Sequence, residues 1–189
     1  MKHSDKYRPF LLGSAAVLAG ALAIAGCQNQ PAHADEKSAV TNSLNSSNLS
    51  SVSVSQDRDK GVMTLTGDVS SDDQKAQAEN LTRQAAPDYT VANEIGVRPV
   101  GAQGQASSVD SKLDDGIEDN FKAEIKAHKS LDDQSIHAKA KNGTLVLTGS
   151  VKTREQKKEA GSLAKHTPNV QQVVNELEVK PDKHSTATS

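Results

Sequence analysis

The residues that could carry out chemistry in this 189-residue chain are few, and their spacing does not suggest catalysis. His128, His137 and His166 lie on different expected elements with no cysteine nearby, so the spacing of metal ligands is absent. The adjacent acids Asp72 and Asp73 stand at an expected helix start, where the helix dipole favours negative charge. No serine is placed with a histidine and an acid in a recognisable motif. The sequence therefore predicts no enzyme, no metal site and no cofactor.

Cys27, the only cysteine, lies where covalent modification is expected. A basic start precedes an uncharged apolar run that is shorter than the roughly 20 residues needed to cross a bilayer, which indicates an export signal. The run ends in Ile24-Ala25-Gly26-Cys27, which resembles a lipobox, the motif in which signal peptidase II cleaves before a lipid-modified cysteine. We therefore expect residues 1–27 to be a lipoprotein signal peptide and acylated Cys27 to hold the chain at the membrane.

The alternative is ordinary signal-peptide cleavage, because Ala32-His33-Ala34 is an A-x-A site. Cleavage after Ala34 would give a soluble periplasmic protein. In lipoproteins sorted by the residue after the cysteine, Gln28 resembles an address for the outer membrane, facing the periplasm. These two localisations remain open at the level of sequence.

A run of lysines in the second half of the chain is the best candidate for a binding surface. Between residues 121 and 166 there are ten basic and five acidic side chains. Lysines near a membrane attract anionic headgroups, each by about 1 kcal/mol. The candidate phospholipid-binding residues are Phe121, Lys122, Ile125, Lys126 and Lys129, with the apolar pair flanked by the bases. The alternative is that the apolar stripe belongs to a core and the lysines only solvate a helix.

Composition excludes other partners. The net charge is −2 and only 2% of the residues are aromatic, with no tryptophan. The chain therefore offers no basic field for nucleic acid and no aromatic platform on which bases could stack. We expect no nucleic-acid binding.

An internal repeat organises the rest of the chain. At an offset of 82 residues, the segment 61–69 aligns with 143–151 without a gap, and the match continues for about thirty residues. In both copies a hairpin pattern is followed by a helix start of the form Ser/Thr-x-x-Gln, and then by an alternating strand. These patterns predict two domains, at 36–98 and 110–180.

The segments around these domains are polar or rich in small residues. Leu113, Ile117, Phe121 and Ile125 recur every fourth residue and predict a first helix for the second copy, whereas the matching helix of the first copy should be short. We expect residues 28–35 to be a tether, residues 99–109 a flexible linker and residues 181–189 a disordered tail.

The repeated unit resembles the BON domain, most closely at Leu147-Thr-Gly149-Ser-Val151 and Val173-Val-Asn-Glu-Leu177. The resemblance implies an α+β fold, with two small αββαβ sandwiches in which a three-stranded mixed sheet packs on two helices. Gly67 and Gly149 match the characteristic glycine of the family, which we expect to serve a structural turn after the strand.

The resemblance also implies a non-enzymatic protein of the bacterial envelope. Its expected role is to bind anionic phospholipid or other envelope surfaces through the BON domains, in envelope integrity or osmotic-stress protection. The alternative is a periplasmic module, soluble or tethered, that binds an envelope protein or peptidoglycan without recognising lipid directly.

Overall fold

The computed structural model describes residues 32–98 and 103–181, with the backbone alone for residues 103–108. The predicted signal peptide, Cys27 and the tail beyond Pro181 lie outside the described residues. Within the described part of the chain, no helix is both long enough and apolar enough to span a membrane.

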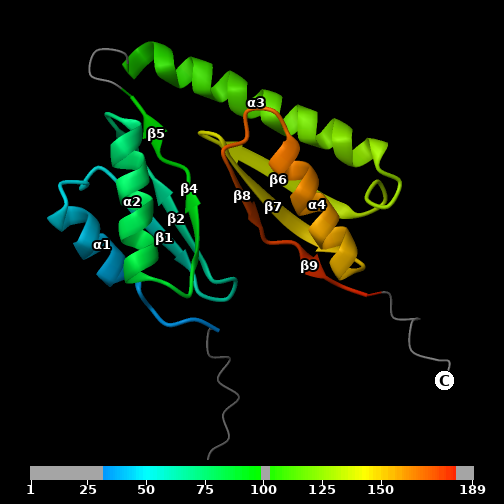
Figure 1. Cartoon of the computed structure of the whole chain (residues 1–189), viewed down its shortest axis with the longest axis horizontal. Coiled ribbons are helices and arrows are strands. Elements are labelled where there is room, and N and C mark those ends of the chain that lie inside the picture. The colour runs from blue at the N-terminus through cyan, green and yellow to red at the C-terminus, as the bar shows by residue number, and fades with distance from the viewer. Residues whose placement is uncertain (1–31, 99–102, 182–189) are drawn as a thin grey trace, which may run out of the picture. The chain divides into compact units, whose positions relative to one another are not determined.

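The first copy of the repeat forms a small α+β domain (Figure 1). Its elements are α1 (Lys37–Ser46), β1 (Ser53–Asp57), β2 (Val62–Thr66), β3 (Asp68–Val69), α2 (Asp72–Ala85), β4 (Thr90–Asn93) and β5 (Gly96–Val97). β2 is the central strand, antiparallel to β1 and parallel to β4, and β3 pairs with β5 in parallel. The core joins Val40 and Leu44 of α1, Ala78 of α2, and Met63 and Leu65 of β2.

The second copy repeats this arrangement with a longer first helix. Its elements are α3 (Gln103–Ala127), β6 (Ser135–Lys141), β7 (Thr144–Val151), α4 (Arg154–His166), β8 (Gln172–Asn175) and β9 (Glu178–Val179). β7 is antiparallel to β6 and parallel to both β8 and β9. The fold class predicted from the sequence, two αββαβ units with mixed sheets, is confirmed.

The second helix of each copy begins at the residue that the repeat predicts. Ser71 accepts a hydrogen bond from the Gln74 backbone amide at 3.4 Å, and Thr153 accepts one from the Gln156 amide at 3.1 Å. In α4 the Gln156 side chain also accepts from the Thr153 amide at 3.0 Å, which completes the capping box.

Gly67 and Gly149 adopt φ angles of 116° and 108°, which side chains rarely tolerate. A Cβ atom at either position would collide with a backbone carbonyl, that of Ser51 or Ser135 respectively. The turn expected after the strand is not what they form, because Gly149 lies inside β7 and Gly67 separates β2 from β3, whose partner is β5. Each glycine thus lets a backbone carbonyl approach closely, that of Ser51 just before β1 at Gly67 and that of Ser135 at the start of β6 at Gly149.

Two segment boundaries differ from the sequence prediction. α3 begins at Gln103, so residues 103–109 of the expected linker are helical. The end of the expected tether is bound to the first domain: His33 and Arg58 exchange two hydrogen bonds, and the Tyr89 hydroxyl donates to the carbonyl of Ala34. The early start of α3 has a local cause, because the glutamines and the alanine of residues 103–109 are good helix formers. A prediction based on linker composition alone overlooks this property.

The two copies also contact each other along β4 and β8, although loose joining was expected. Val62 and Ala92 of the first sheet pack against Val174 and Val146 of the second, on the faces turned away from the helices. Polar contacts surround this small apolar cluster.

Candidate functional site

α3 carries four of the five candidate phospholipid-binding residues and Lys129 follows its C-terminal end, but the five do not share one face. Phe121 is 1% exposed and Ile125 is 9% exposed, and both pack in the core of the second domain with Leu145 and Leu147 of β7. They are therefore unavailable to a bilayer in the folded protein. Their spacing of four residues reflects the helix stripe that faces the sheet.

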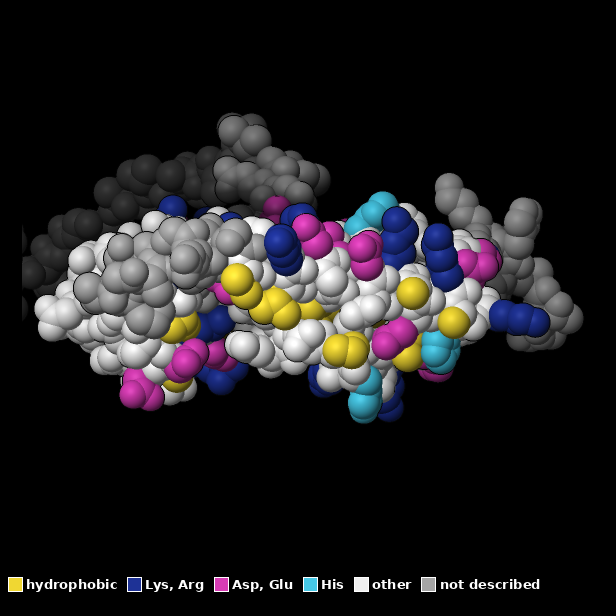
Figure 2. Space-filling model, turned by 90° about the horizontal axis from the view of Figure 1, so that it is seen from above, with side chains coloured by type: hydrophobic (Ala, Val, Ile, Leu, Met, Phe, Trp, Pro, Cys, Tyr) yellow, Lys and Arg dark blue, Asp and Glu magenta, His cyan; other side chains and the backbone are white. Residues whose placement is uncertain are grey.

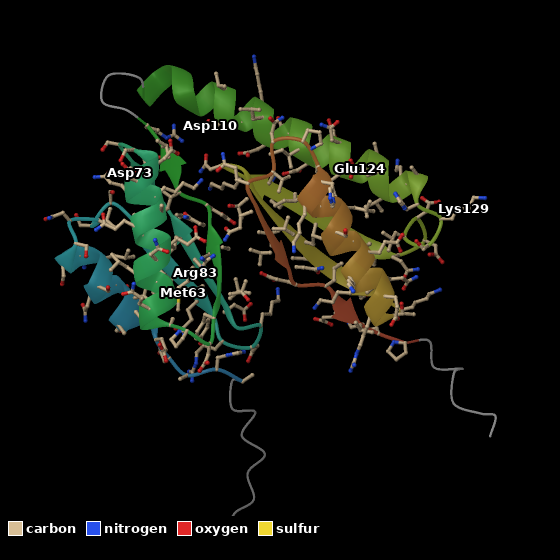
Figure 3. The ribbon with its side chains drawn as sticks, in the orientation of Figure 1. Met63, Asp73, Arg83, Asp110, Glu124 and Lys129 are labelled. Atoms are coloured by element: carbon tan, nitrogen blue, oxygen red, sulfur yellow. The ribbon has the colours of Figure 1, made fainter. Side chains whose placement is uncertain are left out.

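Lys122, Lys126 and Lys129 remain exposed on and just after the C-terminal half of α3. Figure 3 shows Lys129 at this end of the helix. Among the described residues none of the three forms an ion pair. Other lysines of the domain do pair; Lys139, for example, lies 3.1 Å from Glu118. The three form what we call the α3 lysine cluster.

Three acids of α3 are engaged by structural contacts and not by these lysines. Glu118 accepts a hydrogen bond from the Ala140 amide at 2.9 Å, and Asp114 accepts from the Asn142 amide at 3.0 Å. These carboxylates thus cap the outer edge of β6, whose backbone amides have no further strand to pair with. Glu124 accepts from Thr167 at 3.3 Å. Structural contacts occupy three acids of α3 and leave the lysine cluster facing solvent.

A shallow hollow lies beside the cluster, between α3 and β6. Its lining includes Lys122 and Lys126 together with Asp119, Asp132 and His137. Charges of both signs therefore line the hollow, so it does not extend the basic surface. In the view from above, Lys and Arg side chains stand in several places with Asp and Glu among them (Figure 2).

Sequence analysis missed the exposed apolar residues of α3. Leu113 was expected to be in the core stripe, but its exposed fraction is 42%, and Val109 is 55% exposed. Both belong to the N-terminal half of the helix, away from the lysine cluster. No pattern in the sequence distinguishes Leu113 from Ile117, because both fit the same period.

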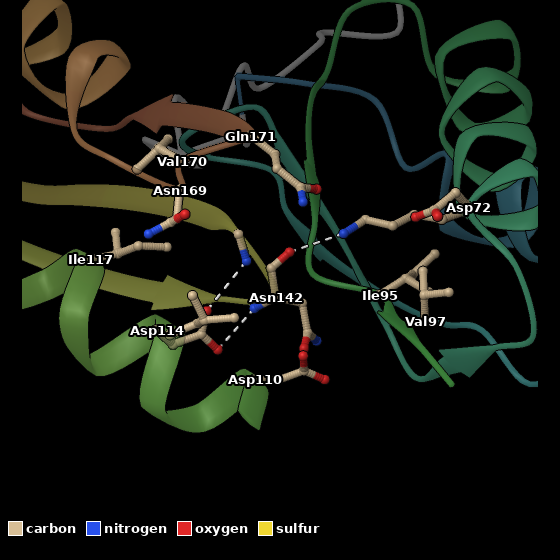
Figure 4. A pocket seen from close by; sticks show the side chains of 13 residues that line it. Asp72, Ile95, Val97, Asp110, Asp114, Ile117, Asn142, Asn169, Val170 and Gln171 are labelled. Carbon is tan, nitrogen blue, oxygen red and sulfur yellow. Dashed lines mark hydrogen bonds between the residues drawn. The ribbon is translucent and has the colours of Figure 1, made fainter. Parts of the chain in front are cut away.

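A pocket of about 310 Å³ lies near this end of α3 and is lined by both copies (Figure 4). Lys75 of α2 donates to the carbonyl of Asn142 at 3.0 Å, and Asp72, Asp110 and Asp114 line the same pocket. Burial lowers the pKa of the Lys75 ammonium, while the nearby carboxylates oppose this shift. Asp114 holds the Asn142 backbone within the second copy, and Lys75 links that backbone to the first copy, so both charges are already engaged.

Gln172 of β8 makes the most specific contact between the copies, and sequence analysis did not single it out. Its side-chain amide donates to the carbonyl of Val91 at 2.9 Å and accepts from the amide of Asn93 at 2.8 Å. Thr144 adds a hydrogen bond to the Asn93 carbonyl at 2.6 Å. A signal was present: Gln172 aligns with Thr90 in the repeat, while the next residues, Val173 and Val91, match.

No group of three or more His, Cys, Asp or Glu side chains in the described ranges is placed to hold a metal ion. His128 lies 3.4 Å from Glu159, and a ring nitrogen of His166 lies 2.7 Å from the Ser162 carbonyl.

Comparison with known proteins identifies one family. The model of the BON domain matches residues 34–99 and 113–181. No curated protein matches the chain. Among solved structures, CdsD, a structural protein of the type III secretion system of Chlamydia trachomatis, is similar at a TM-score of 0.28 and 12% identity, over 78% of this chain and 63% of that one. The C-terminal domain of CdsD gives a TM-score of 0.27 and 14% identity, over 75% of this chain and 96% of that one.

Proposed function

We propose that this chain, which belongs to the BON domain family, is a non-enzymatic, lipid-anchored envelope protein whose second domain contacts anionic phospholipid through the α3 lysine cluster. BON domains occur in bacterial periplasmic and envelope proteins, and the family suggests membrane binding or a role in osmotic stress. Our proposal adds three specific points: the ligand is anionic phospholipid, the α3 lysine cluster binds it, and acylated Cys27 anchors the chain at the outer membrane.

One observation carries the assignment to α3. Lys122, Lys126 and Lys129 are exposed without ion pairs among the described residues, while three acids of the same helix are turned toward β6 and Thr167. With Phe121 and Ile125 in the core, the contact is electrostatic, with headgroups rather than with acyl chains. Binding should therefore weaken as salt screens the charges.

The packing of residues 32–34 supports anchoring through Cys27. Cleavage after Ala34 would remove His33, whose backbone exchanges hydrogen bonds with Arg58 at 3.2 and 3.0 Å. It would also remove the Ala34 carbonyl to which Tyr89 donates. Cleavage before Cys27 keeps these contacts. We expect the intact mass of the mature protein to correspond to a chain that begins at acylated Cys27; a chain that begins at Asp35 contradicts the anchor.

Vesicle co-sedimentation of the unlipidated chain 28–189 tests the lipid contact. The variant K122E/K126E/K129E should bind phosphatidylglycerol vesicles at least about 100-fold more weakly than the wild type, since each lysine contributes about 1 kcal/mol. Phosphatidylcholine vesicles should bind neither protein. High salt should weaken wild-type binding to the anionic vesicles.

The matched control is K37E/R83E/K180E, which changes the net charge equally at exposed positions outside α3. It should retain most of the binding, and circular dichroism should show both variants folded. Equal losses in the two variants would mean that net charge alone drives binding, and unchanged binding of the α3 variant would remove the site. Absence of wild-type binding would direct the search to protein or peptidoglycan partners.

A further inference from the structure

The contact between the two copies has an approximate twofold relation. Lys60 donates to the Glu176 carboxylate at 2.8 Å, and Asn142 donates to the Glu94 carbonyl at 2.7 Å. The repeat offset of 82 residues converts Lys60 into Asn142 and Glu94 into Glu176, so each contact is the counterpart of the other. The copies therefore meet through equivalent surfaces.

The relation fails at several positions, and one of them is Gln172, which aligns with Thr90. The side chain of Gln172 crosses to the open edge of β4, where one carboxamide satisfies both the Val91 carbonyl and the Asn93 amide. A threonine side chain is too short to do the same, and Thr90 makes no side-chain hydrogen bond with any described residue.

The edge of β8 is consequently left open. Along β8 the amides of Gln172 and Glu176 donate to Gly143 and Leu147 of the neighbouring loop and strand, at 3.2 and 2.8 Å. The intervening residues Val173 and Asn175 point their backbone groups the other way, as alternation in a strand requires. Within the described ranges, neither the Val173 carbonyl nor the Asn175 amide has a partner.

The space beside this edge can admit a ligand. A hollow of about 620 Å³ is lined by Val62 and Thr90 of the first copy and by Val174 and Asn175 of β8. Its charged residues are largely paired, Lys60 with Glu176 and Lys180 with Glu178 at 2.7 Å. Paired charges favour a neutral polar ligand over an anion.

We propose that the open edge of β8 docks an extended polypeptide segment that presents a Gln or Asn side chain to Val173 and Asn175. The equivalent contact already exists within the molecule. On β4 the carboxamide of Gln172 binds the Val91 carbonyl and the Asn93 amide, which are the counterparts of Val173 and Asn175 in the repeat. This surface lies on a different element from α3, so it does not rest on the proposed lipid contact.

Hydrogen exchange of the full mature chain tests whether the edge is open. In the wild type the Asn175 amide should exchange at least about tenfold faster than the Asn93 amide, which Gln172 protects. The variant T90Q places a carboxamide opposite β8 and should slow the Asn175 amide about tenfold, whereas T90M, of similar length without the amide, should not. Equal protection of both amides in the wild type would overturn the proposal.

Titration with the peptide acetyl-Val-Gln-Gln-Val-Val-amide, the sequence of residues 170–174, tests the ligand. The peptide should shift the amide resonances of Asn175 and Thr90 in the wild type. Its affinity should be about tenfold lower for T90Q, where the site is filled, and unchanged for T90M. Replacing its second glutamine by threonine should weaken binding equally. Undiminished binding to T90Q, or equal binding of the threonine peptide, would overturn the assignment. Neither variant touches the α3 lysine cluster, so vesicle binding should be unchanged.

Discussion

The two domains share one design and differ in what they leave exposed. Both contain a hairpin, a capped second helix and a short parallel strand, and the parallel strands pair in the same register of the repeat. The first domain has a helix α1 of 10 residues and its edge strand β4 is bound by Gln172. The second has a helix α3 of 25 residues that carries two of the three lysines of the cluster, and its edge strand β8 is open among the described residues. The duplicated frame is common, whereas the candidate binding surfaces belong to the second copy.

The difference in helix length has a local cause. α1 ends in Asn45 and Ser46, whose side chains compete with the helix for backbone hydrogen bonds, and Asn48 follows with a φ of 59°. α3 instead continues through Gly116, where a Cβ would meet no atom within 4 Å. A longer helix covers the edge of β6 and still exposes its outer face.

The largest effect expected is on the common frame. G67A and G149A should each lower the free energy of unfolding by about 3 kcal/mol or more, because positive φ costs an alanine roughly 1–2 kcal/mol and the new Cβ collides with a backbone carbonyl. Urea denaturation measures this. G116A serves as the control and should be neutral or stabilising by up to about 1 kcal/mol. A small loss at only one of the two positions would show that the domains do not share this bend.

The common frame is also the part that sequence predicts well. Helix caps at Ser71 and Thr153 follow from residue type and spacing, because capping is a local interaction. The sequence alone could not predict whether Phe121 is buried in the core or exposed to a membrane. An apolar stripe that faces a sheet and one that faces a bilayer have the same period. The role of Gln172 depends on a docking between domains that no local pattern encodes. Only its departure from the repeat marked the position.

A smaller effect should separate the two edge strands. Q172A leaves the Val91 carbonyl and the Asn93 amide without their partner and should cost about 2 kcal/mol in free energy of unfolding. T90A removes the equivalent side chain, which forms no hydrogen bond with a described residue, and should change stability by less than about 0.5 kcal/mol. Thermal and urea unfolding of both variants gives the comparison. Equal costs would mean that the edges are alike and that the asymmetry between the domains is incorrect.

The smallest effect concerns Glu94 and Glu176, the glutamates at equivalent positions of the twofold contact. Burial raises the pKa of Glu94, with a smaller opposing effect from Lys141, whereas the hydrogen bond to Glu176 raises the pKa of Lys60. Between pH 4.5 and the raised pKa of Glu94, the folded chain holds a proton that the unfolded chain has released, so stability falls as pH rises through this window.

At pH 7, E94Q should therefore stabilise the protein slightly, and its advantage over the wild type should shrink as the pH falls from the raised pKa of Glu94 to 4.5. E176Q should destabilise it by about 0.5 kcal/mol, the scale of a partly exposed ion pair. The raised pKa of Lys60 gives stability that is complete below pH 10.5 and is lost as the pH rises through the folded value, so E176Q and the wild type should converge there. Urea denaturation at pH 4, 7 and 11 measures both variants. Opposite signs at pH 7 would show that two equivalent positions of one duplicated surface have acquired different electrostatic roles, while equal signs would return them to a symmetric contact.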